Sequence, residues 1–171
     1  MPCTLPLLMA SRSGTTPCRI SPLMNHEHWM REALFEAQAA AQEGEIPVGA
    51  VVVWHEQIIG RGHNCKEALC DPTAHAEVLA LREAAHTRRS WRLSGATLYC
   101  TLEPCCMCAG AMVNARLDGL VYAVRDPKTG AAGSVYDLLR SPWLNHRLLV
   151  VSGVLADEVQ GLMQAFFQNL R

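Results

Sequence analysis

Apolar residues recur at helical spacing in separate parts of the chain. The first such pattern follows Asn25, which predicts that residue as an N-cap, and ends at Gly44. Asp71 followed by Pro72 predicts another helix start, with the aspartate as N-cap and the proline at the first helical position. The predicted helices occupy residues 25–44, 71–85, 105–114 and 156–170.

Short β-branched and apolar runs between these helices predict the strands of a sheet. The run at 48–54 is followed by a hairpin partner at 57–60. The remaining predicted strands are 96–101, 120–124 and 148–151. The polar residues 63–71 and the glycine-rich segment 126–134 are expected to be loops. Strands alternating with helices in this order predict an α/β fold with a partly parallel sheet.

Composition agrees with one folded domain in a chain of 171 residues. Hydrophobic residues make up 50% and charged residues 18%, which is enough apolar material for a core and argues against disorder. The formal net charge of -1 lacks the strongly basic balance that is typical of nucleic-acid-binding domains. Any contact with RNA would therefore have to come from a local patch.

The first 23 residues differ from the rest of the chain. They are low in charge and rich in Pro, Ser and Thr, which predicts a disordered leader. Pro6 interrupts their short apolar stretch and Arg12 follows it, so they make a poor secretory signal. Met24 is then an alternative start, and we expect residues 24–171 to form the functional domain. No run reaches the ~18 apolar residues that a spanning helix needs, so no membrane association is expected.

Cysteine usage indicates metal chemistry in a reducing, cytoplasmic setting. The chain has eight cysteines, and three of them fall within 105–108, directly after a proline. Such a cluster in a mid-sized chain is more typical of a metal site than of a disulfide framework.

Cys105 and Cys108 are the first candidate metal ligands. At i and i+3 they share a helix face, and thiolates at a helix N-terminus are favoured by the helix dipole and suit zinc. Cys106 points elsewhere and is expected to pack. A lone C-x-x-C also fits a redox pair or half of a zinc ribbon, but Cys65 and Cys70 are too loosely placed to complete a ribbon.

His75 supplies a third candidate ligand and leaves one tetrahedral position for water, which is the arrangement of a catalytic zinc. Glu77 is the candidate base for that water; two positions apart on a helix, it and His75 would not share a face, so only one would bind the metal. Alone, such a histidine usually packs and such a glutamate is usually solvated. Together with Pro-Cys-x-x-Cys they match the H-x-E…P-C-x-x-C signature by which zinc nucleobase deaminases are defined.

From about Glu27 to its end, the sequence resembles the cytidine deaminase-like superfamily, and within it the bacterial tRNA-specific adenosine deaminases. The stretches that carry the resemblance are 45–50, 71–77, 101–105 with 108–112, and 125–134. The resemblance implies a three-layer α/β/α fold around a mixed five-stranded sheet. It also implies one zinc ion per subunit, held by His75, Cys105 and Cys108, and a homodimer.

The same resemblance implies hydrolytic deamination of the wobble adenosine of a tRNA anticodon to inosine, with Glu77 moving the protons between water, base and leaving amine. Asn64 would bond the flipped base, and Val48 and Ala76 would line its pocket. The residues implied in RNA contact are Arg125, Asp126 and Lys128. Each of these residues also has a purely structural interpretation, as a turn asparagine, a core residue or a solvated charge.

Two alternatives remain open at this stage. The same zinc site serves deaminases of free bases or nucleotides such as guanine, cytosine or deoxycytidylate; segment 126–134 favours tRNA, whereas the slightly acidic balance of the chain mildly favours a small substrate. The second alternative is a binding module with a structural zinc. The missing fourth protein ligand and the presence of Glu77 argue against it.

Overall fold

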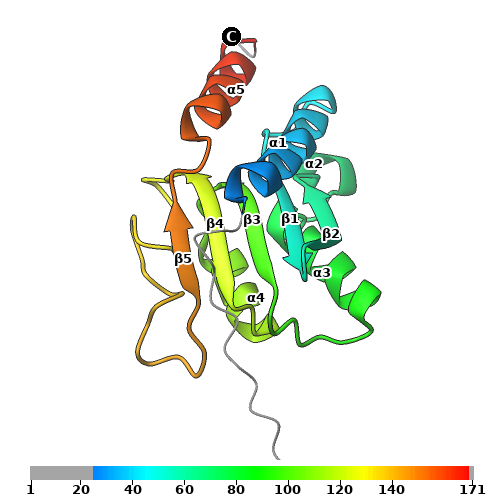
Figure 1. Ribbon diagram of the computed structural model, residues 1–171. Helices are drawn as coiled ribbons and strands as arrows, with labels where there is room; N and C mark the ends of the chain where they lie inside the picture. Colours follow the sequence, from blue (N-terminus) through cyan, green and yellow to red (C-terminus); the bar gives the residue numbers. More distant parts are fainter. Residues whose placement is uncertain (1–24, 170–171) are drawn as a thin grey trace, which may run out of the picture.

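The computed structural model describes residues 25–169, which form a five-stranded mixed sheet with helices on both faces (Figure 1). The predicted leader, and Met24 as a start, lie outside the described residues. The strands are β1 (Gly49–Trp54), β2 (Gln57–His63), β3 (Thr97–Leu102), β4 (Gly119–Val124) and β5 (Leu149–Ser152). The helices are α1 (His26–Gln42), α2 (Lys66–Leu69), α3 (Ala76–Arg88), α4 (Cys106–Ala115) and α5 (Ala156–Asn169). The predicted three-layer fold with a mixed sheet is confirmed.

Strand β1 shows how the two cores are built from one sequence. Successive side chains of a strand point to opposite faces of the sheet. Val52 packs in the core beneath α3 and α4, while Val51 and Val53 pack in the core beneath α1 and α5. All three are almost completely buried, so the strand is apolar on both faces and does not alternate with polar residues.

Glycines in the strands let the backbone of the helices pack directly against the backbone of the sheet. A Cβ added at Gly49 in β1 would lie 2.1 Å from the carbonyl oxygen of Ala33 in α1. On the other face, a Cβ added at Gly62 in β2 would lie 2.5 Å from the carbonyl oxygen of Ala76 in α3. Both helices therefore pack against the strand backbone. The contact at Gly62 fixes the position of the start of α3 relative to the end of β2.

The order of strands is β2-β1-β3-β4-β5, and β1 is antiparallel to both of its neighbours while β3, β4 and β5 are parallel. Because of this reversal, the carboxyl ends of β2, β3 and β4 meet the amino end of β1 at one edge of the sheet. The N–H of Gly49 in β1 donates to the hydroxyl of Thr101 in β3 at this edge. Ligands of α/β sheets bind at the carboxyl ends of strands, so this edge is where a site is expected.

The start of α3 differs from the prediction. The helix begins at Ala76 with His75 as its N-cap, and Asp71 and Pro72 lie outside it. The carboxylate of Asp71 accepts hydrogen bonds from both the N–H and the hydroxyl of Thr73, at 2.8 and 2.7 Å. These local bonds form a turn that competes with helix initiation, so the helix starts about one turn later.

Other boundaries also moved. Helix α4 begins at Cys106 with Cys105 as N-cap, so Pro104 precedes the helix and does not open it. Part of the predicted loop 63–71 forms the short helix α2, and β2 extends to His63. Asn25 is confirmed as the N-cap of α1, since its side chain accepts from the N–H of His28.

Helix α5 lies beyond the end of β5, on the α1 side of the sheet (Figure 1). Its Val159 is buried against α1 and the sheet. Within residues 25–169, none of the helices combines the length and the apolar character that crossing a membrane requires.

We expect Gly62→Ala to lower the free energy of unfolding by about 1–3 kcal/mol, because the new methyl group would push α3 away from β2. Gly161→Ala in α5 is the matched control, since no atom lies within 4 Å of its added Cβ and alanine favours a helix. Urea unfolding of the two variants measures the difference. Equal midpoints would show that α3 tolerates displacement from the sheet.

Candidate active site

A cavity of about 110 Å³ opens at the edge where the strand ends meet. It is bounded by the amino end of β1, the carboxyl ends of β2 and β3, the starts of α3 and α4, and the loop that follows β4. The lining residues are Ile46, Val48, Asn64, Lys66, His75, Ala76, Glu77, Leu102, Glu103, Cys105, Asp126 and Thr129. The sequence predictions Val48, Asn64, His75, Ala76, Glu77, Cys105 and Asp126 are thus brought together.

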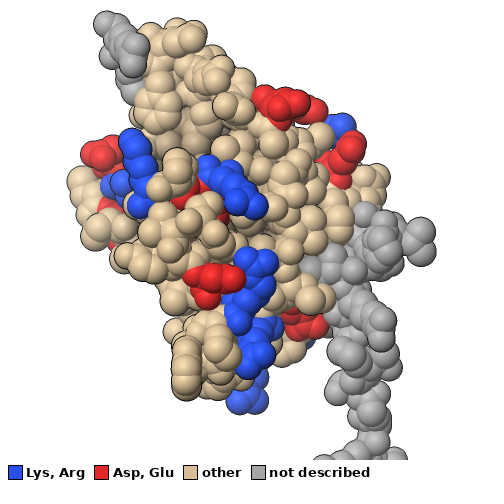
Figure 2. Space-filling model, turned by 90° about the vertical axis from the view of Figure 1, so that its left-hand side faces the viewer, with Lys and Arg blue, Asp and Glu red and all other residues tan. Residues whose placement is uncertain are grey.

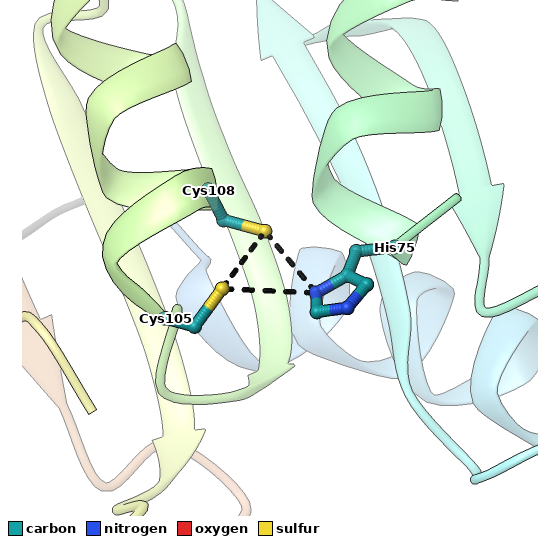
Figure 3. A group of neighbouring side chains, drawn as sticks. All are labelled: His75, Cys105 and Cys108. Carbon is teal, nitrogen blue, oxygen red and sulfur yellow. Dashed lines mark hydrogen bonds between the residues drawn. The ribbon is translucent and has the colours of Figure 1, made fainter. Parts of the chain in front are cut away.

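His75, Cys105 and Cys108 point toward one another from the starts of α3 and α4 (Figure 3). The two sulfur atoms lie 3.7 Å apart, and Nδ1 of His75 lies 3.8 Å from Cys105 Sγ and 3.5 Å from Cys108 Sγ. A tetrahedral zinc ion with bonds of ~2.3 Å to sulfur and ~2.0–2.1 Å to nitrogen would space its ligands by about 3.5–3.8 Å. The three atoms therefore fit one such ion.

The open side of this three-residue group, where a fourth ligand would bind, faces the cavity. His75 and Cys105 line the cavity, whereas Cys108 does not line it and is fully buried. No other His, Cys, Asp or Glu joins the group within the part of the chain that is described. Three protein ligands with one open side can hold a metal and leave a position for water or substrate.

The pKa values of the two cysteine thiols shift in opposite directions. The hydrogen bond between the two sulfurs lowers the pKa of Cys105 to about 3, and the same pairing raises the pKa of Cys108. The hydrogen bond with Cys105 raises the pKa of His75. One sulfur is thus already a thiolate near neutral pH, at the N-terminus of α4 where negative charge is favoured.

Glu77 lies in the first turn of α3 and borders the cavity, with only 4% of its surface exposed. Burial raises the pKa of its carboxyl group. His75 is the extended N-cap residue and lies outside the helix, with φ −77° and ψ 149°. The predicted separation of the two side chains by helix face therefore does not apply, and both reach the same cavity.

Asn64, which lines the cavity, forms a pair with Glu45. Asn64 follows β2, is 5% exposed, and donates from Nδ2 to a carboxylate oxygen of Glu45 at 2.9 Å. Glu45 is itself buried, and sequence reasoning did not single it out. A lone glutamate before Ile-Pro gives no local sign that it will be buried.

Glu103 is a second buried carboxylate that the sequence did not reveal. It is 2% exposed and accepts hydrogen bonds from the N–H groups of Asp126, Ala132 and Ser134. The hydroxyl of Ser134 also donates to it. One side chain therefore holds both ends of segment 126–134 against the end of β3.

Gly130 makes that arrangement possible. A Cβ added there would lie 2.6 Å from the Cδ atom of Glu103 and 2.5 Å from the carbonyl oxygen of Asp126. Gly130 thus allows close packing around a buried carboxylate.

The residues implied in RNA contact fall in two places. Asp126 lines the cavity, whereas Arg125 and Lys128 are exposed outside it. The face of the molecule on the β5 side carries a line of basic side chains with scattered acidic ones (Figure 2). A local basic surface thus exists on a chain whose net charge is -1.

A second group of potential metal ligands consists of Glu43, His63 and Cys65. Both ring nitrogens of His63 already contact carboxylates, Nδ1 that of Glu36 at 3.4 Å and Nε2 that of Glu43 at 3.3 Å. This group is a polar network at the surface of α1 and β2.

Cys106 is exposed, so the prediction that it packs is wrong; as the first residue of α4 it faces away from the core.

Comparison with known proteins agrees with this geometry. The sequence profile of the MafB19-like deaminase family matches residues 24–171. The tRNA-specific adenosine deaminase of Bacillus subtilis (strain 168) is 48% identical over 145 residues, which cover 85% of this chain and 90% of that protein. The tRNA-specific adenosine deaminase of Haemophilus influenzae is 49% identical over 146 residues, covering 85% and 84%.

Among solved structures, one from a study of A-to-I editing by tRNA:A34 deaminases at the wobble position of transfer RNA is similar to most of this chain. Its TM-score is 0.76 at 41% identity, and the match covers 79% of this chain and 98% of that chain.

We expect Glu103→Ala to release segment 126–134, because buried N–H groups left without an acceptor cost about 1–3 kcal/mol each. Amide hydrogen exchange of Asp126, Ala132 and Ser134 should accelerate selectively. The exchange rates of Glu103→Gln should fall between those of the wild type and of Glu103→Ala, since its single carbonyl oxygen can accept from only one end of the segment. Unchanged protection of these three amides in Glu103→Ala would contradict this role.

Proposed function

Because the chain belongs to the MafB19-like deaminase family, we propose that it is a zinc-dependent tRNA adenosine deaminase that converts the wobble adenosine of an anticodon to inosine. The observation that carries the proposal is the triangle of His75, Cys105 and Cys108, open toward a cavity that a buried glutamate borders. The matching relatives bear the name of that activity.

We propose that His75, Cys105 and Cys108 hold one zinc ion per subunit. Zinc would supply a Lewis acid that makes a water molecule more acidic at neutral pH. The chain would contribute the three ligands and the negative charge of the Cys105 thiolate. Cys108 and Ala76 are fully buried, whereas His75 and Cys105 line the cavity.

Glu77 would carry the protons. Hydrolytic deamination adds water at C6 of adenine and releases ammonia, so one proton must reach the ring nitrogen and another the amine. The carboxylate of Glu77 would accept the proton of the attacking water and deliver it to the ring nitrogen, and would then move the second proton to the leaving amine. Burial raises the pKa of this group, which favours holding a proton between the two transfers.

Asn64, Val48 and Ala76 would receive the base, since all three line the cavity. A base in an anticodon loop is unpaired, so extruding it costs less than flipping a base out of a duplex. Arg125 and Lys128 are exposed beside the cavity-lining Asp126, where they would contact RNA phosphates.

A homodimer in the cytoplasm is also part of the proposal. Large apolar side chains are exposed on the single chain; Trp91 is 59% and Trp143 92% exposed. Aromatic residues are enriched at protein interfaces.

We expect Glu77→Gln to retain one zinc per chain and to lose about 10²–10⁴-fold in kcat, because it keeps the shape of the side chain without the ability to shuttle protons. Cys108→Ser is the contrasting variant and should lose zinc as well as activity. Metal analysis and single-turnover kinetics measure both. A Glu77→Gln enzyme with full activity would exclude the proton-shuttle role.

The substrate is tested by comparing an anticodon stem-loop that bears wobble adenosine with free adenosine, guanine, cytosine, cytidine and deoxycytidylate. We expect inosine to form in the stem-loop alone, and a stem-loop with guanosine at the wobble position should remain unchanged. Conversion of a free base or nucleotide alone would favour a small-molecule deaminase. Zinc binding without turnover of any substrate would favour a structural-zinc module.

A further inference from the structure

We propose that Glu45 is a positioning residue that fixes which way round the side-chain amide of Asn64 faces the base. The inference rests on the proposed function, because it concerns how that pocket holds its substrate. Glu45 itself does not line the cavity, so it would act through Asn64.

Both carboxylate oxygens of Glu45 accept hydrogen bonds, and each oxygen has different donors. Oε2 accepts from Nδ2 of Asn64 at 2.9 Å, and Oε1 accepts from the backbone N–H groups of Glu67 and Ala68 at 2.8 and 2.9 Å. The side chain is 3% exposed, so water does not compete for these bonds. Glu45 thus joins Asn64 to the first turn of α2.

The backbone of Asn64 is held independently of that pair. Its N–H donates to the carbonyl of Val48 at 3.0 Å, and the N–H of the next residue, Cys65, donates to the carbonyl of Ala74 at 3.0 Å. These bonds tie Asn64 to the amino end of β1 and to the segment just before His75. What they leave undetermined is the rotation of the terminal amide, whose NH₂ and carbonyl have nearly the same shape.

The carboxylate removes that ambiguity. An ionised carboxylate only accepts hydrogen bonds, so it attracts the NH₂ group of Asn64 and repels its carbonyl oxygen. A rotated amide would place two oxygen atoms in contact in a buried environment, which is costly. With one N–H directed to Glu45, the second N–H and the carbonyl oxygen of Asn64 remain in a fixed order for the base.

The consequence for catalysis is a matter of orientation more than of affinity. Most of the affinity for a stem-loop comes from its phosphate backbone, which Asn64 does not need to contact. A base held with its hydrogen-bonding edge reversed is misplaced relative to Glu77 and the metal ligands. Loss of orientation should therefore lower kcat and leave KM nearly unchanged.

Glu45→Gln is the sharpest test, since it changes polarity without changing shape. The carbonyl of the glutamine can still accept from Glu67 and Ala68, so its NH₂ group must face Asn64. Asn64 can then restore a hydrogen bond only by rotating its amide. We expect kcat on the stem-loop to fall about 10- to 100-fold, because the rotated amide no longer matches the donors and acceptors of the base and leaves one of them without a partner. KM should change less than about twofold, and zinc content should be retained.

Glu67→Gln is the matched control. It makes the same chemical change nearby, but the side chain of Glu67 is exposed and only its backbone N–H contacts Glu45. It should behave as the wild type. If kcat of Glu45→Gln lies within twofold of this control, the proposal is overturned.

A stability cycle tests the same hydrogen bond without relying on activity, and it decides the matter if Glu45→Gln folds poorly. Asn64→Asp places two carboxylates in contact and should lower the melting temperature. Glu45→Gln combined with Asn64→Asp restores a donor facing an acceptor and should regain about 5 °C or more over Asn64→Asp alone. If the double variant shows no recovery, Glu45 does not orient the amide.

The two proposals can fail separately. A wild-type chain that leaves the stem-loop unchanged would reject the proposed function, while the stability cycle would still report on the pairing of Glu45 with Asn64. An active wild type whose stability cycle shows no coupling would reject only the role of Glu45.

Discussion

The reversal of strand direction between β1 and β3 is the constraint on which the site depends. In a fully parallel sheet, the start of β1 and the end of β2 would lie at opposite edges. Here β1 runs against both neighbours, so Val48 and Asn64 lie at the same edge as Cys105 and Asp126. Two helices then begin at that edge, and their positive ends face the cavity that the strand ends enclose.

A sheet edge built from loops carries backbone N–H groups that no ladder satisfies, and this chain meets the need with two buried carboxylates. Glu45 accepts from two backbone N–H groups in the first turn of α2, and Glu103 accepts from three in segment 126–134. Burial without such partners would cost several kcal/mol for each charge, so these glutamates and their loops stabilise one another. The same bonds set the two walls of the cavity, Asn64 on one side and Asp126 on the other.

The sequence predicted the group of His75, Cys105 and Cys108, which the structure brings together, because the signal for this group is local. Cys105 and Cys108 are three positions apart, and His75 and Glu77 occur with them in a recognised pattern. Glu45 and Glu103 were not found, because their partners lie 19 to 31 positions away and a single glutamate carries no periodic signal. The start of α3 was misplaced for a different reason, since Asp71 used its carboxylate on Thr73 before a helix could begin. Register, burial and competition between local hydrogen bonds are decided by the whole fold.

The later start of α3 and α4 places His75 and Cys105 at N-cap positions. An N-cap side chain usually bonds an N–H of its own helix. His75 and Cys105 occupy N-cap positions, yet neither side chain caps its helix, and both backbones are extended. The extended backbone turns each side chain toward the other instead of along its own helix, which brings Nδ1 and Sγ within 3.8 Å. If both residues lay inside their helices, as the proline-started prediction required, their side chains would point along the helix flanks. The triangle of proposed metal ligands therefore exists because each helix begins one residue after one of its members, His75 or Cys105. The third member, Cys108, lies on the first turn of α4, where its sulfur completes the group.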